Sequence, residues 1–168
     1  MKHNFVYRKL LNIVIIAASL ISVGCDRLDD QRIPPAPVNI PFATVGDWNV
    51  MGVGGALDYR RFIKEELIPS DYHYSAISAT GFGGVLLVCD VNGAPVAYDL
   101  SCPVECKRDV RIFVNADELV GECPKCHSTY DIFTLGGHPL SGQAAKDGCG
   151  LRRYNVGSGR ADYMIVSN

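Results

Sequence analysis

Two pairs of cysteines lie at spacings that are typical of metal-binding or redox loops. Cys102 and Cys106 belong to the run DLSCPVECK, and Cys123 and Cys126 belong to the run GECPKCHSTYD. A thiolate is a nucleophile and a soft metal ligand, and Cys-x-x-Cys is a common half-site for a metal. A proline follows the first cysteine of each pair and narrows the conformations open to the unfolded loop. The four cysteines are therefore candidate ligands of one shared centre.

The spacing leaves three outcomes open for these four cysteines. They hold iron or an iron–sulfur cluster, or they hold a single zinc or iron ion as a structural staple. In the third outcome no metal binds, and the thiols are reduced or paired as disulfides, for example Cys102 with Cys106 and Cys123 with Cys126. A thioredoxin-like redox motif is not expected, because the β-rich run HSTYDIF follows Cys126 where that motif needs a helix.

The segments that must position the cysteines have the pattern of short β-strands. Val85–Val91 is a buried-strand run, and Asn92-Gly93 predicts a two-residue type I′ hairpin turn before Pro95–Leu100. Further strands are predicted in the runs VRIFV, ELVGE, TYDIF, LRRYNV and DYMIV. Each cysteine pair comes directly after one of these strands. Short strands at nearly even spacing predict a mainly β fold, an antiparallel sandwich or small barrel.

One helix is expected before the strands. Apolar residues recur at helical spacing between Leu57 and Leu67, charged residues fill the opposite face, and Pro69 ends the pattern. The preceding run GVGG lacks the glycine spacing and the βαβ context of a nucleotide loop, so a plain turn is expected there.

The N-terminal residues have the pattern of an export signal. Residues 1–24 join a basic start to an apolar run that is too short for a membrane span, and the run ends at Ser22-Val23-Gly24-Cys25. This ending resembles a bacterial lipobox, which implies cleavage before Cys25 and lipidation of its thiol. Residues 25–41 are rich in proline and predict an extended tether, which leaves residues 42–168 as the folded domain. We therefore expect an extracytoplasmic lipoprotein of the bacterial cell envelope, attached to the membrane by its lipid anchor.

The composition excludes one class of partner. The chain of 168 residues has a formal net charge of −2, which gives no basic surface for nucleic acid. The sequence holds seven cysteines, and two of them have ordinary interpretations. Cys89 lies in a buried-strand run, where a free cysteine behaves as a small apolar residue. Cys149 lies in DGCG, either as a turn residue or as the partner of another thiol.

The segment from Gly84 to Val156 resembles a Rieske iron–sulfur domain. The resemblance is carried by the runs AYDLSCP, CPKCHSTYD, GGHPLSGQA and LRRYNV, in that order and at family spacing. It implies a Rieske-like antiparallel β-sandwich with a small cluster-binding subdomain. It also implies that Cys102 and Cys123 correspond to the two cysteine ligands of a [2Fe–2S] cluster, with GGHPLSGQA as a covering loop and Tyr130 as the family tyrosine near the cluster.

The histidine ligands of that family are replaced. Val104 stands at the first histidine position and Cys126 at the second, while Gln143 stands at the proline of the covering loop. Cys106 is the expected fourth ligand. All-thiolate ligation would move the reduction potential toward about −400 mV, below the roughly −150 to +300 mV of Rieske centres.

The sequence thus leads to two hypotheses of different classes. The first is an envelope-anchored iron–sulfur protein that transfers electrons to a redox partner whose identity the sequence does not give. The second is a Rieske-fold binding or structural module without a cluster, held by disulfides or zinc. No catalytic motif stands apart from the cysteines, so an enzymatic role is left open. His127, His138 and Glu105 lie close enough along the chain to be considered as ligands, but exposed or hydrogen-bonded loop positions are expected for them.

Overall fold

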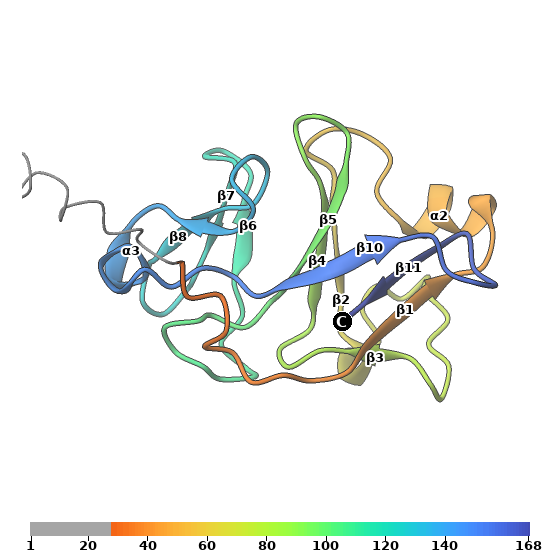
Figure 1. Cartoon of the computed structure of the whole chain (residues 1–168), viewed down its shortest axis with the longest axis horizontal. Coiled ribbons are helices and arrows are strands. Elements are labelled where there is room, and N and C mark those ends of the chain that lie inside the picture. The colour runs from red at the N-terminus through yellow and green to blue at the C-terminus, as the bar shows by residue number, and fades with distance from the viewer. Residues whose placement is uncertain (1–27) are drawn as a thin grey trace, which may run out of the picture.

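A computed structural model describes residues 28–168, and its fold is mainly β with antiparallel sheets, as the sequence predicts. The predicted signal segment and Cys25 lie outside the described residues. One sheet has seven strands in the order β2-β4-β5-β10-β11-β1-β3, and the other has four in the order β6-β7-β8-β9 (Figure 1). The strands of the larger sheet are β1 (Val38–Phe42), β2 (Tyr59–Phe62), β3 (Ala79–Thr80), β4 (Val85–Cys89), β5 (Pro95–Asp99), β10 (Arg153–Gly157) and β11 (Met164–Ser167).

The smaller sheet forms a separate lobe beside β4 and β5, together with helix α3 (Figure 1). Its strands are β6 (Phe113–Asn115), β7 (Val120–Glu122), β8 (Thr129–Asp131) and β9 (His138–Pro139), and α3 spans Gly142–Asp147. This lobe contains both cysteine loops.

Strand β4 lies between two hydrophobic cores. Leu86 and Val88 pack into the core shared with the small lobe, whereas Val85, Leu87 and Cys89 pack into the core of the large sheet. Alternate side chains of a strand point to opposite faces, so burial of all five residues requires both faces to be covered. The buried position predicted for Cys89 is confirmed. Through Leu86 and Val88, β4 also packs against the core that contains Cys102 and Cys123.

The helix predicted over Leu57–Leu67 is wrong. Those residues form β2, which pairs with β4, and a short 3₁₀ turn, η1 (Lys64–Glu66). Phe62 and Ile63 are neighbours in sequence and both are buried, one in each core, which suits a strand and not a one-faced helix. Pairing with a buried strand has overridden the local helical spacing. The N-terminal helix is instead α2 (Val45–Met51), which begins at a capping box between Thr44 and Asp47.

The hairpin between β4 and β5 is confirmed, but its predicted turn type is wrong. Among these loop residues only Gly93 has positive φ, at 85°, whereas a type I′ turn would also need positive φ at Asn92. The loop is longer, because Asp90 N–H donates to Ala94 O at 2.8 Å. The side chain of Asp90 accepts from the N–H groups of Asn92 and Ala94, so a local carboxylate has selected the wider loop.

The part of the predicted tether that the structure describes packs on the domain. Asp29 N–H donates to Gly148 O at 2.8 Å, Ile33 is buried, and β1 begins at Val38 and pairs with β11. The folded part therefore begins before residue 42, in contrast to the predicted boundary. Prolines fix an extended backbone, and an extended segment can lie along a surface as readily as it can leave one.

None of the helices in the described range 28–168 has the length and apolar content that crossing a membrane requires.

A buried carboxylate holds the chain just before the first cysteine loop. Asp99, the last residue of β5, accepts from the N–H groups of Gly83 at 3.0 Å and Ser101 at 2.7 Å. Its second oxygen accepts from Phe82 N–H at 2.8 Å and from the hydroxyl of Tyr154 at 2.6 Å. Asp99 therefore joins three segments at the point where the chain leaves the large sheet for Cys102.

We predict that Asp99→Ala lowers the free energy of unfolding by about 3 kcal/mol or more, because buried N–H groups lose their acceptor. Urea unfolding followed by fluorescence measures this. Tyr154→Phe removes only one of the four hydrogen bonds and should cost about 1 kcal/mol. Equal costs for the two variants would show that Asp99 does not organise this region.

Candidate metal centre

Three of the four predicted ligands meet in the small lobe. The sulfur atoms of Cys102, Cys123 and Cys126 all lie within 4.8 Å of one another. The sulfurs of Cys102 and Cys126 are 3.6 Å apart, well beyond the roughly 2.05 Å of a disulfide bond. Cys102 and Cys123 are fully buried in the apolar core, while Cys126 is partly exposed. Three thiolates at this separation can bind a metal ion.

The first loop is closed by backbone hydrogen bonds around Cys102. Cys102 N–H donates to Val110 O at 3.0 Å, and Cys106 N–H donates back to Cys102 O at 2.8 Å. The turn therefore begins where β5 ends, as the sequence pattern predicts. Cys106 closes it with a positive φ of 49°, a conformation that costs energy for a residue other than glycine.

The second loop has the same construction between β7 and β8. Cys123 N–H donates to Ser128 O, and His127 N–H donates to Cys123 O, both at 3.0 Å. His127 has a positive φ of 54° and turns the chain back into β8. The two loops are alike, since in each the N–H four residues after the first cysteine donates to the carbonyl of that cysteine.

An ion pair joins the tips of the two loops. Lys125 of the second loop lies 2.5 Å from the carboxylate of Glu105 in the first. The lysine is largely exposed, so the pair contributes little stability, but it favours the closed arrangement of the loops. The carboxylate of Glu105, a possible oxygen ligand by its place in the sequence, is engaged by this lysine in the structure.

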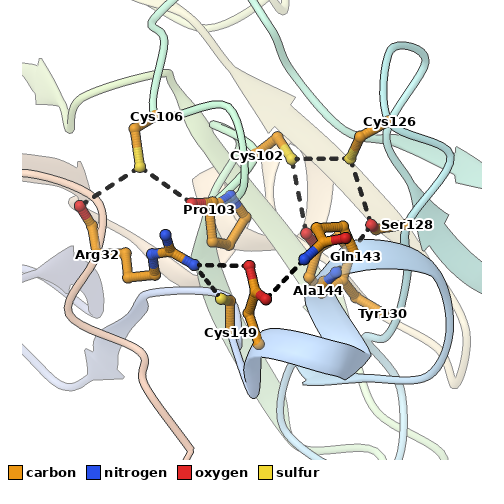
Figure 2. A network of polar contacts seen from close by, with 11 residues as sticks. Arg32, Cys102, Pro103, Cys106, Cys126, Ser128, Tyr130, Gln143, Ala144 and Cys149 are labelled. Carbon is orange, nitrogen blue, oxygen red and sulfur yellow. Dashed lines mark hydrogen bonds and ion pairs between the residues drawn. The ribbon is translucent and has the colours of Figure 1, made fainter.

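Two hydroxyl groups contact the sulfurs, one from β8 and one from the residue just before it. The hydroxyl of Tyr130 lies 3.6 Å from Sγ of Cys102, and the hydroxyl of Ser128 lies 3.3 Å from Sγ of Cys126. Ala144 N–H, in α3, donates to the Ser128 hydroxyl at 3.1 Å (Figure 2). Oγ of Ser128 thus accepts both from α3 and from the thiol of Cys126, and its hydroxyl can turn to donate to that sulfur once the thiol is ionised.

Helix α3 approaches this closely because its first residue is glycine. Gly142 has a φ of 73°, and a Cβ there would lie 2.7 Å from Oγ of Ser128. The segment predicted to cover the centre therefore lies over the second loop (Figure 2). Gln143, at the position where the resembling family has proline, points its amide to Asp147 at 2.7 Å within the helix.

The surroundings of Cys102 and Cys126 shift the pKa values of their thiols in opposite directions. Burial raises the pKa of Cys102 to about 12, despite a hydrogen bond from the Glu105 backbone that acts in the opposite direction. Burial also acts to raise the pKa of Cys126, but hydrogen bonds from Ser128 and from the neighbouring cysteines outweigh it and lower that pKa. Burial next to the cysteines raises the pKa of Tyr130, which remains a neutral hydrogen-bond donor. Cys126 is thus the thiol that ionises before Cys102.

The structure places Cys106 outside this group. Its sulfur lies 3.0 Å from Pro103 O and 3.6 Å from Arg32 O, and it is not within 4.8 Å of all three other sulfurs. In Figure 2 Cys106 lies beside Arg32 and Pro103, while Cys102 and Cys126 face each other. The reason is the positive φ at Cys106 together with the two carbonyl contacts. The expectation that Cys106 is the fourth ligand therefore has no support in this arrangement.

The remaining candidates have other environments. His127 and His138 are exposed, as expected, and Nδ1 of His127 lies 3.6 Å from Glu122. Cys149 is buried and its sulfur accepts from the guanidinium of Arg32, which also pairs with Asp147 at 3.4 Å. Sequence reasoning missed this contact and the contact of Ser128 with Cys126, because neither follows from local spacing.

Comparison with protein-family models, with curated proteins and with solved structures finds no match to the chain.

We predict that Cys→Ser variants separate the ligands from the other thiols. The variants of Cys102, Cys123 and Cys126 should each bind a metal at least roughly tenfold more weakly, because one of three thiolates is lost. Cys106→Ser should bind as the wild type does. Titration with Co²⁺, read from thiolate charge-transfer absorption, measures this, and a loss in Cys106→Ser equal to that of the others would contradict the assignment.

We also predict that metal binding strengthens as pH rises across the neutral range. Cys102 holds its proton there in the metal-free protein, so a metal must displace that proton to bind. The apparent affinity for Co²⁺ should rise by up to about tenfold per pH unit for each proton released. Competition with a chelator of known affinity gives the slope. An affinity that does not change with pH would show that the site binds without Cys102.

Proposed function

We propose that this chain is an iron–sulfur electron-transfer protein whose centre is held by Cys102, Cys123 and Cys126. The proposal is carried by one observation, the convergence of three thiols from two similar loops in an apolar core. When bound, a cluster of this kind accepts and returns single electrons. The chain itself supplies the thiolate ligands, excludes water from two of them and keeps the third near the surface.

The surroundings of the sulfurs favour a redox centre over a structural ion. Structural zinc is usually enclosed by four protein ligands, whereas three cysteines converge here within residues 28–168. The hydroxyls of Tyr130 and Ser128 lie beside two of the sulfurs, and hydrogen bonds to cluster sulfur are a recognised means of setting reduction potential. The partial exposure of Cys126 leaves one edge of the centre open to a redox partner.

The resemblance to Rieske domains supports the iron–sulfur assignment. Cys102 and Cys123 stand at the family's cysteine positions and Cys126 at one of its histidine positions, so three of four ligand positions hold a donor that the fold brings together. We further propose that Cys25 carries a lipid and that the domain works on the outer side of a bacterial membrane. The export pattern of residues 1–24 supports that location.

A second candidate is a module without a cluster, and one distance favours it. Sγ of Cys102 and Sγ of Cys126 lie only 3.6 Å apart, and a small movement of the second loop would allow a disulfide between them. Outside the cytosol such a bond would persist. The protein would then be a binding or structural domain, with its loops held by a disulfide or by zinc.

We predict that protein purified without oxygen contains iron and acid-labile sulfide and is coloured. Its reduction potential should lie below the Rieske range, toward about −400 mV, because the thiolate of Cys126 replaces a neutral imidazole. Metal analysis, sulfide assay and spectroelectrochemistry on one sample measure this. The control is Cys89→Ser, which alters a buried thiol in the other core and should keep the iron. A colourless, iron-free sample with a mapped Cys102–Cys126 disulfide would establish the second candidate instead.

A further inference from the structure

We infer that the centre keeps one exchangeable coordination position, which a small sulfur or nitrogen donor from solution fills. The inference rests on the proposed function, because it concerns the same three cysteines. A thiol would bind there as its thiolate and release its proton to solvent, and an imidazole would bind in its neutral form.

The donors nearest to the three cysteines along the chain are engaged elsewhere. The sulfur of Cys106 faces the carbonyls of Pro103 and Arg32. The carboxylate of Glu105 is paired with Lys125 at 2.5 Å, and His127, whose side chain is 75% exposed, lies beside Glu122. Each of these contacts would have to break before the side chain could ligate a metal with the three sulfurs.

The first loop presents an apolar side chain where a fourth donor would be expected. Val104 follows Cys102 by two residues and packs, partly buried, against the core that contains Cys102 and Cys123. A valine side chain has no lone pair to offer a metal. A fourth donor must therefore come from elsewhere.

Access to the centre exists on one side. Cys102 and Cys123 are fully buried, but Cys126 is partly exposed, so an external donor approaches past Cys126. Sites with three protein ligands and one exchangeable position are the arrangement that lets a bound metal accept an outside ligand.

The first experiment maps which thiols the metal protects. The full chain, with and without iron, is treated with an alkylating reagent, and each cysteine is quantified by mass spectrometry. We expect iron to slow the alkylation of Cys126, the partly exposed ligand, and to leave the rate at Cys106 unchanged, whereas the buried Cys102 and Cys123 react slowly in both forms. A further cysteine whose alkylation slows only when iron is bound would overturn the inference.

The second experiment tests the open position directly with imidazole as the probe. Imidazole should cause a saturable change in the visible spectrum of the loaded wild type. Val104→His supplies a donor from the first loop and should weaken the response to imidazole by at least roughly tenfold. Val104→Ala, the matched control, keeps the three thiols and should respond as the wild type does. A wild type that is unchanged by imidazole would contradict the inference.

The two proposals fail in different ways. A sample that takes up no iron defeats the proposed function and the inference together. A sample that holds iron and in which iron slows the alkylation of a further cysteine defeats only the inference. Because alkylation mapping uses the unaltered chain, it decides the question even if Val104→His does not fold.

Discussion

The main constraint on the small lobe is that three sulfur atoms lie close together in an apolar core. Two loops from different strand pairs must end within a few ångströms of each other, and two of the three thiols are fully buried. As neutral thiols they pack like small apolar groups. As thiolates they would repel each other strongly in this low-dielectric surrounding, unless a cation lay between them. The site is therefore stable when protonated or when metal-bound, but not when ionised and empty.

The rest of the small lobe serves to keep those loops together. Asp99 fixes the backbone just before Cys102, the pair of Lys125 and Glu105 links the loop tips, and Ala144 connects α3 to the second loop through Ser128. These contacts come from the large sheet, the loop surfaces and the covering helix. Together they hold the two cysteine loops against each other from three sides of the lobe.

The segment before β1, which the sequence predicts to be an extended tether, holds the lobe further. Arg32 contacts the sulfur of Cys149 with its guanidinium and the sulfur of Cys106 with its carbonyl, so it lies between the first loop and the end of α3 (Figure 2). A residue that the sequence places 70 positions before the loop thus contacts two thiols that lie outside the group of three.

The sequence by itself determined the mainly β fold, the strands around Cys102 and Cys123, the burial of Cys89 and the grouping of cysteines in two loops. These follow from alternation, turn residues and short spacing, which are local properties. Only the tertiary structure decided that Tyr59–Phe62 is a strand, because pairing with β4 outweighs helical spacing. It likewise decided that Cys126 joins the centre and Cys106 does not, since that choice rests on contacts between segments far apart in the chain.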